Sequence, residues 1–166
     1  GTPSEFDFYR YDVCKVFGEK PIALCSDHSG FQAKEMAKKT LDTLKVPYID
    51  YGCFVEQDCD YKDYVQEAVR AITDRTCDFG MSFCRTGQGV NMCANKYSGI
   101  RSALIYDEFS AEMAVRHNCA NMFAIPALLV ENNKAFPSFL QTTVDKFIKN
   151  TFDGGRFQAR VMDLEK

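Results

Sequence analysis

The chain has 166 residues, of which 46% are hydrophobic, and its 20 basic and 23 acidic residues give a net charge of -3. This length fits one domain with a sizeable apolar core, which needs neither a metal nor a disulfide for stability. The near-balance of charge leaves no broad positive surface for a nucleic acid, so any anion would be bound locally. We therefore expect a single domain with no nucleic-acid partner.

The eight cysteines are spread along the chain and include no C-x-x-C pair. This spacing argues against a disulfide framework and against a zinc site, and it favours a reducing cytosol. No stretch approaches the roughly 18 apolar residues that a membrane span needs, and no apolar signal-peptide region opens the sequence. The expected protein is cytoplasmic, with no bound metal and no membrane partner.

Residues 1–20 precede the first apolar run and are interpreted as an N-terminal extension, and residues 21–166 as one domain. Five short apolar runs follow without polar alternation, which is typical of strands buried on both faces of a parallel sheet. In chain order, the expected strands are residues 22–25, 46–49, 79–83, 103–105 and 122–125.

Apolar residues at helical spacing separate these strands, most clearly over residues 61–72 and again over residues 33–44. Four further helices are expected. One begins near residue 88, a second ends at residue 117, a third runs from about residue 138 to 148, and a last short helix ends near residue 164. The alternation of strand and helix with short connections predicts a doubly wound, three-layer α/β domain, Rossmann-like, with a mainly parallel sheet of about five strands.

Ligands of such sheets bind beyond the carboxyl ends of the strands, so the turns at those ends are the places to look for a site. The turn after the third strand, residues 84–89, begins with Cys84 and leads into a helix. Amide groups at a helix start attract anions and favour a thiolate over a thiol, and Arg85 would act in the same direction. A buried, unreactive cysteine is the alternative, and the turn by itself does not decide between the two.

The same turn contains Gly87 and Gly89, a weak match to a dinucleotide-binding motif, because Met92 stands where the third glycine would be. The Gly-Lys-Ser/Thr of a P-loop does not follow either. Two glycines do allow backbone amides to approach an oxyanion closely, which suits a small molecule that carries a phosphate.

His28 and His117 are the only histidines, so any imidazole chemistry depends on them. Each has a structural alternative, since Asp27 beside His28 could cap a helix start and His117 could cap a helix end. Arg156 and Arg160 lie four residues apart and could clamp a phosphate from one helix face, or could form a solvated surface.

Five stretches taken together resemble the type B ribose-5-phosphate isomerases and the related galactose-6-phosphate isomerase subunits. They are "IALCSDHSGF" (22–31), "DYKDY" (60–64), "CRTGQGVNMCANKYSGIRSAL" (84–104), "RHNCAN" (116–121) and "GGRFQARV" (154–161). They follow the family's order and spacing over about residues 21–164. The resemblance implies an aldose–ketose isomerase that acts on a sugar phosphate through an enediolate, without a metal or another cofactor.

By similarity, Cys84 would be the base that moves a proton between C1 and C2 of the sugar. Thr86 and the backbone amides of the following turn would stabilise the enediolate oxygen. The residues of that turn are Gly87, Gln88 and Gly89. His117, assisted by Asp27, would open the furanose ring.

The resemblance also implies that His28, Arg156 and Arg160 hold the phosphate, and that Tyr61 and Asn118 contact the sugar or its ring oxygen. The family builds its site across a dimer interface. This implies a homodimer, or a dimer of such dimers, in which each site is shared between two chains.

The sequence departs from the family pattern at several positions. Val90 stands where some relatives have a glutamate base, so the cysteine variety is the better match, which favours ribose 5-phosphate and the pentose phosphate pathway over a galactose phosphate. Arg85 replaces the glycine of the usual "CGTG", Phe157 a frequent histidine, and Leu128 a common arginine. Two alternatives therefore stay open: isomerisation of another aldose phosphate, such as allose or galactose 6-phosphate, and sugar-phosphate binding without catalysis.

Overall fold

Five parallel strands form one sheet in the computed structural model of the chain, which describes residues 20–132 and 134–165. The strands are β1 (Ile22–Ser26), β2 (Tyr48–Asp50), β3 (Gly80–Cys84), β4 (Ser102–Leu104) and β5 (Met122–Pro126). They are ordered β2-β1-β3-β5-β4, and each neighbouring pair is parallel. The order changes direction between β1 and β3, and ligands of doubly wound folds bind beyond the strand ends at such a point.

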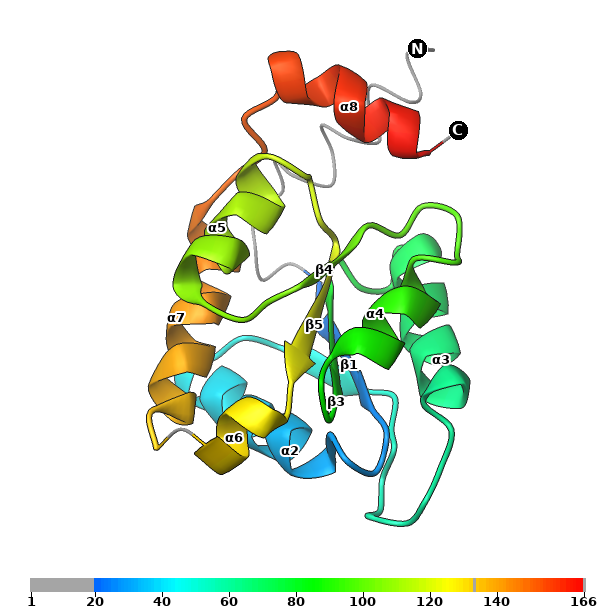
Figure 1. Ribbon diagram of the computed structural model, residues 1–166, viewed down its shortest axis with the longest axis vertical. Coiled ribbons are helices and arrows are strands. Elements are labelled where there is room, and N and C mark those ends of the chain that lie inside the picture. Colours follow the sequence, from blue (N-terminus) through cyan, green and yellow to red (C-terminus); the bar gives the residue numbers. More distant parts are fainter. Residues whose placement is uncertain (1–19, 133, 166) are drawn as a thin grey trace.

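Seven helices of the described residues connect and cover the strands (Figure 1). They are α2 (Phe31–Leu44), α3 (Tyr61–Thr73), α4 (Gln88–Ala94), α5 (Glu108–Arg116), α6 (Leu128–Asn132), α7 (Phe136–Lys149) and α8 (Arg156–Leu164). The predicted α/β fold with a five-stranded parallel sheet is confirmed. Only α6 was not expected, because its five residues span too few turns to show a helical period.

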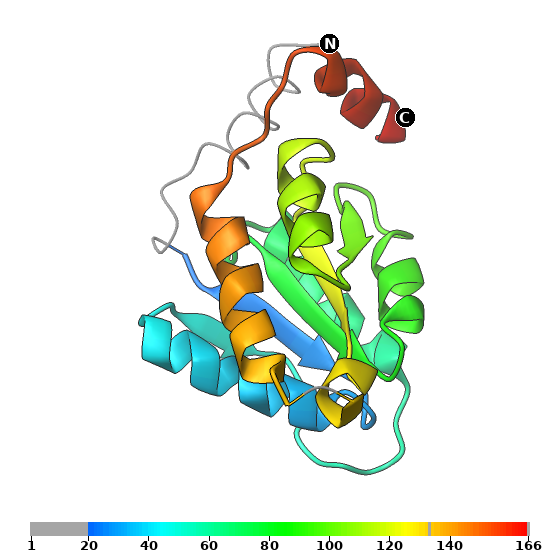
Figure 2. The ribbon, with the colours of Figure 1, turned by 60° about the vertical axis from the view of Figure 1, so that its left-hand side comes forward.

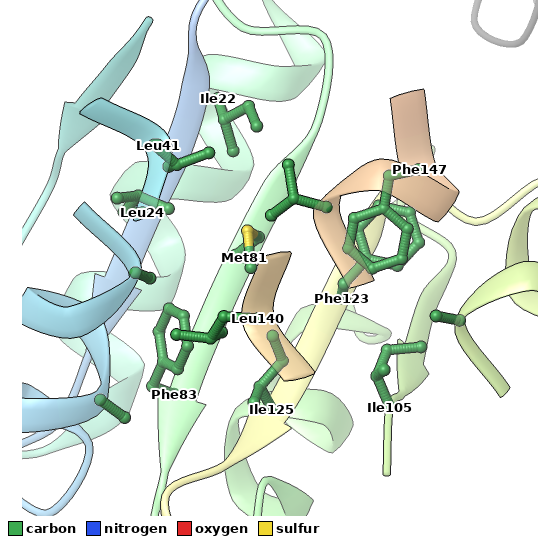
Figure 3. Packing of buried hydrophobic residues seen from close by; sticks show 14 of the residues in the cluster. Ile22, Leu24, Leu41, Met81, Phe83, Ile105, Phe123, Ile125, Leu140 and Phe147 are labelled. Carbon is green, nitrogen blue, oxygen red and sulfur yellow. The ribbon is translucent and has the colours of Figure 1, made fainter. Parts of the chain in front are cut away.

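The sheet separates two apolar layers. Helices α2, α5 and α7 cover one face, where Leu140 and Phe147 of α7 pack with Met81 and Phe123 of the sheet (Figure 3). On that face the rings of Phe123 and Phe147 stack with their centroids 3.5 Å apart. Helices α3 and α4 cover the other face. Their buried apolar residues there are Val65, Ala68, Val69, Ala71, Ile72, Val90 and Ala94.

The central strands β1, β3 and β5 are almost entirely buried, whereas every residue of β2 and β4 is only half-buried. The prediction of strands buried on both faces is therefore right for the central strands and wrong for the other two. The reason is that β2 and β4 form the edges of the sheet.

The last helix, α8, lies at the end of the molecule from which the strands start, away from the main core (Figures 1 and 2). Val161 of α8 and Cys119 form a small separate cluster, against which Phe152 and Met162 pack. Arg101 Nη1 donates to Glu165 Oε1 at 2.8 Å and ties the end of the chain to the residue before β4. The N-terminal extension expected over residues 1–20 falls outside the described residues, except for residue 20.

Candidate functional site

The turns after β1 and β3 are joined by hydrogen bonds at the point where the sheet order changes direction. The N–H of Asp27, which follows β1, donates to the carbonyl of Phe83 at 3.2 Å. Asp27 Oδ1 accepts the Gly30 N–H at 2.9 Å and the Ser29 hydroxyl at 2.6 Å. Ser29 Oγ in turn accepts the N–H of Arg85 at 2.9 Å. Ser29 therefore links the two turns, and the N-cap of α2 is Gly30 rather than Asp27.

Cys84 ends β3 on the side of the sheet that α3 and α4 cover, and it is 6% exposed. Its carbonyl accepts the N–H of Gly87 at 3.3 Å. Gly87 has a φ of +74°, and a Cβ there would come within 2.7 Å of Leu104 Cδ1, so this turn requires glycine. Exposed Thr86 lies between them, and its Oγ1 accepts the Gln88 N–H at 3.4 Å. The turn thus places the Thr86 hydroxyl two residues after an almost buried thiol.

Tyr61 begins α3 and lies against the same turn. A Cβ at Gly89 would come within 2.8 Å of Tyr61 Cε1, so the missing side chain at Gly89 makes room for the phenol ring. Asp60 caps the helix and accepts the Lys62 N–H at 2.9 Å, which fixes the position of the first helical residue. Tyr61 remains 37% exposed and can therefore be reached by a ligand.

His28 is tied to the loop that precedes α3. Its Nδ1 accepts the N–H of Cys59 at 3.3 Å and lies 3.6 Å from Asp58 Oδ1. Because Nδ1 is an acceptor, the neutral imidazole carries its proton on Nε2. The side chain is 40% exposed, so Nε2 can serve as a donor to a ligand.

Lys34 is a residue of this region that the sequence analysis missed. Its side chain is fully buried, and Nζ donates to Asp50 Oδ1 at 2.6 Å and to the carbonyl of Cys53 at 2.5 Å. These bonds hold the start of the loop between β2 and α3. The signal was present, since Lys34 shares the buried face of α2 with Ala37 and Leu41 at helical spacing.

Further candidate residues lie at the opposite edge of the sheet, where α5 ends and before β5 begins. His117 is the C-cap residue of α5, and its ring stacks on Phe157 with centroids 4.0 Å apart and planes inclined by 15°. His117 Nε2 lies 3.6 Å from Asp153 Oδ2, and the same oxygen lies 3.1 Å from Arg116 Nη2. Exposed Asn118 follows directly. The side chains at this end of α5 therefore form a cluster of His117, Arg116, Asp153 and Phe157.

Two arginines of α8 belong to the same cluster. The guanidinium carbon of Arg156 lies 4.9 Å from the Phe157 ring centroid, and that of Arg160 lies 5.9 Å from it. Both distances fall within the range of cation–π attraction. A ring from α8 therefore contacts His117 and both arginines.

The candidate residues of one chain accordingly form two separate groups. The carboxyl-edge group, beyond the strand ends, contains Asp27, His28, Tyr61, Cys84, Thr86, Gly87, Gln88 and Gly89. The amino-edge group, at the end of α5 and on α8, contains His117, Asn118, Arg156 and Arg160. A strand of five residues, such as β5, keeps the two edges about 13 Å apart. One chain therefore does not bring the two groups together (Figure 1).

The other thiols near Cys84 are poorly suited to ionise. Burial raises the pKa of the Cys25 thiol well above its usual value, and it also raises the pKa of Cys93 on α4. All seven cysteines in the described part of the chain are free thiols. Among the same residues, no group of three or more His, Cys, Asp or Glu side chains could hold a metal ion. No helix described there is long and apolar enough to cross a membrane.

Residues 22–164 match the model of a family described as Ribose/Galactose Isomerase. The chain belongs to this family. A putative sugar phosphate isomerase of Rickettsia bellii is 33% identical to it over 144 residues, which cover 87% of this chain and 96% of the relative.

Solved structures of other ribose/galactose isomerases share the fold. The ribose 5-phosphate isomerase of Thermotoga maritima has a TM-score of 0.82 and 35% identity, and the match covers 89% of this chain and 98% of that one. Ribose-5-phosphate isomerase B from Mycoplasma genitalium, solved with bound ribulose-5-phosphate, has a TM-score of 0.77 and 30% identity, covering 89% and 95% of the two chains. The family resemblance inferred from the sequence is confirmed.

Two departures of this ribose/galactose isomerase from the family pattern are neighbours in space. The N–H of Leu128 donates to the carbonyl of Arg85 at 3.0 Å. Arg85, which replaces a family glycine, and Leu128, which replaces a family arginine, are therefore hydrogen-bonded neighbours at the carboxyl edge of the sheet.

Proposed function

We propose that the protein is a ribose-5-phosphate isomerase, which interconverts ribose 5-phosphate and ribulose 5-phosphate through an enediolate. The observation that carries this proposal is the position of Cys84. An almost buried thiol ends the central strand where the sheet order changes direction, between the Asp27 turn and the Thr86 turn. The family membership and the named activities of its relatives support the same reaction.

Proton transfer between C1 and C2 is the chemical step. The Cys84 thiolate takes the proton from C2 of the open-chain aldose, and the C1 carbonyl oxygen becomes the enediolate oxygen. The thiol then returns the proton to C1, while the O2 proton passes to O1 and leaves a carbonyl at C2. Thr86 and the amides of Gly87, Gln88 and Gly89 are the donors that stabilise the enediolate, because they belong to the turn that follows the base.

Ring opening and phosphate binding need groups from both edges of the sheet. His117 protonates the ring oxygen of the furanose and Asp27 takes the proton of the C1 hydroxyl. His28, through its Nε2 proton, holds the phosphate together with the arginine pair Arg156 and Arg160. Tyr61 and Asn118 contact the sugar.

We propose that each complete site contains the carboxyl-edge group of one chain and the amino-edge group of another. The separation of the two groups within one chain supports a homodimer, or a dimer of such dimers. The enzyme needs no cofactor, acts in the cytoplasm and uses residues 21–166 as its catalytic domain, with residues 1–20 as an extension.

The test is a direct assay of purified protein with ribose 5-phosphate, with ribulose 5-phosphate as the product measured. Cys84→Ala should lower kcat by roughly 10³-fold, because a positioned acid–base group contributes that much. Cys93→Ser is the matched control, since this thiol lies on α4 and has a raised pKa, and it should keep kcat within about twofold.

Two results would contradict the proposal. If allose 6-phosphate or galactose 6-phosphate is converted with a higher kcat/KM than ribose 5-phosphate, the enzyme is an isomerase of another aldose phosphate. If calorimetry detects binding of ribose 5-phosphate and no substrate is turned over, the protein is a sugar-phosphate-binding protein. The structural reason to test this outcome is that Leu128 stands where the family commonly has an arginine.

A further inference from the structure

Phe157 is the side chain through which α8 contacts the imidazole of His117. The two rings are nearly parallel, with planes inclined by 15° and centroids 4.0 Å apart, as in offset-stacked aromatic pairs. Two further attachments of α8 lie elsewhere: Val161 packs on Cys119, and Glu165 pairs with Arg101. These attachments fix the helix, and the Phe157 ring, stacked on the imidazole, restricts the plane of His117.

A confined plane matters because an imidazole can turn about two side-chain bonds. In this cluster Asp153 lies 3.6 Å from Nε2 of His117 and acts on one ring nitrogen from the edge, while Phe157 covers one face of the ring. Together they restrict both the tilt of the ring and the nitrogen that faces the carboxylate. A group that transfers a proton needs such an orientation before the substrate arrives.

We propose that Phe157 is a positioning residue for opening of the sugar ring. It holds the His117 imidazole in the orientation that protonates the ring oxygen, and its ring aligns Arg156 and Arg160 for the phosphate. In this step the bond from C1 to the ring oxygen breaks, the ring oxygen takes a proton from His117, and the C1 hydroxyl loses its proton as the aldehyde forms. The inference rests on the proposed isomerase function and adds a residue to it.

The kinetic test compares Phe157→Leu with Phe157→Tyr and with a control on the same segment. In Phe157→Leu, kcat for conversion of ribose 5-phosphate should fall roughly tenfold, because the imidazole is no longer confined. Phe157→Tyr keeps the aromatic face and should recover most of this activity. Phe152→Leu trims the small cluster of Cys119 and Val161 that docks α8 and leaves the Phe157 ring in place, and it should keep kcat within about twofold.

A second assay separates ring opening from proton transfer at carbon. Ribulose 5-phosphate is an open-chain substrate, since its O5 is esterified and cannot close a five-membered ring. Exchange of its C1 proton in D2O at saturating concentration requires the base but no ring opening. Phe157→Leu should keep this exchange within about twofold of the wild-type rate. A parallel loss of exchange and conversion, or an equal loss in Phe152→Leu, would mean that Phe157 only supports the fold, and the inference would be wrong.

NMR provides a readout that does not depend on turnover. The chain has two histidines, so the imidazole protons of His117 can be followed with those of His28 as an internal reference. The stacked ring should shift the His117 signals upfield in wild type and in Phe157→Tyr, and Phe157→Leu should abolish the shift. Unshifted signals in wild type would overturn the inference. Wild type without isomerase activity would overturn the proposed function and this inference with it, whereas an active wild type matched by Phe157→Leu would overturn the inference alone.

Discussion

The carboxyl-edge group and the amino-edge group are attached to the protein in different ways. Cys84 ends one central, buried strand and Asp27 directly follows another, and the turns at these strand ends are joined through Ser29. His117 lies at the end of a helix, and its partners come from the segment around α8, whose own cluster has Cys119 and Val161 as its buried residues. The first group depends on the main core, and the second on a helix that is docked locally.

The difference separates two tasks of the proposed enzyme. A base that moves a proton between adjacent carbons needs a fixed geometry, which strand ends of a packed sheet provide. Groups that grip the phosphate and open the ring can lie on an element with lower local stability, because such elements can open without global unfolding. The comparison therefore predicts that substitutions which loosen the carboxyl-edge group lower the stability of the whole fold, and that substitutions which loosen the amino-edge group affect only α8 and its contacts.

The largest effect should come from combining the two groups in different chains. Cys84→Ala and His117→Ala homodimers should each be inactive. A heterodimer of these two chains, isolated through two different tags, should have about half of the wild-type activity, because one of its two sites contains both intact groups. The measurement is isomerase activity per mole of heterodimer.

The matched control places both substitutions in one chain. A heterodimer of wild type with the double variant Cys84→Ala and His117→Ala has no complete site if each site is shared, so it should be inactive. If that heterodimer is half-active and the first one is inactive, each chain carries its own complete site, and the division into two complementary groups does not describe the enzyme.

Most of the fold follows from local patterns in the sequence. Apolar runs identified all five strands, and helical spacing identified α2 and α3, because a buried face imposes these periods directly. The second strand was expected two residues too early. Lys45 closes α2 with a φ of +57°, and the Val46 N–H donates to Leu41 O, so these residues end the helix before the strand can begin. The strand order was not predicted, because it depends on pairing between distant segments.

The candidate site was less predictable than the fold. The turns after β1 and β3 could be located because ligands bind beyond strand ends, but their connection through Ser29 joins residues 56 positions apart and leaves no local pattern. The same holds for Asp153 and Phe157, which reach His117 from a later segment. That the two groups occupy opposite edges follows only from the direction of α5, which must return to the amino edge before β5 begins.

The next largest effect is a loss of stability when the loop between β2 and α3 is detached from α2. Lys34→Met removes a fully buried partner of Asp50 and should lower the free energy of unfolding by about 3 kcal/mol. The loss stays at the lower end for a buried pair because Asp50 retains Lys38 at 3.1 Å. Chemical denaturation measures it. Lys39→Met, at an exposed position of the same helix, should change stability by less than about 0.5 kcal/mol. Equal losses would show that the loop is not tied to the core.

The smallest effect on global stability should come from removing the ion pair between Arg101 and Glu165, which docks the end of α8. Glu165→Ala eliminates the bond to Arg101 at 2.8 Å and the acceptor of the Gly99 N–H at 3.3 Å. Because α8 contributes little to the main core, the free energy of unfolding should fall by less than about 1 kcal/mol, and amide exchange within α8 should accelerate by no more than the corresponding factor of about five. Chemical denaturation measures the change in global stability, and hydrogen exchange read by mass spectrometry measures the local opening of α8. Leu164→Ala, at a side chain 68% exposed, is the control and should leave exchange unchanged. A cooperative loss of stability in Glu165→Ala as large as in Lys34→Met would show that α8 folds as part of the core, and the contrast between a core-bound and a locally docked group would then be wrong.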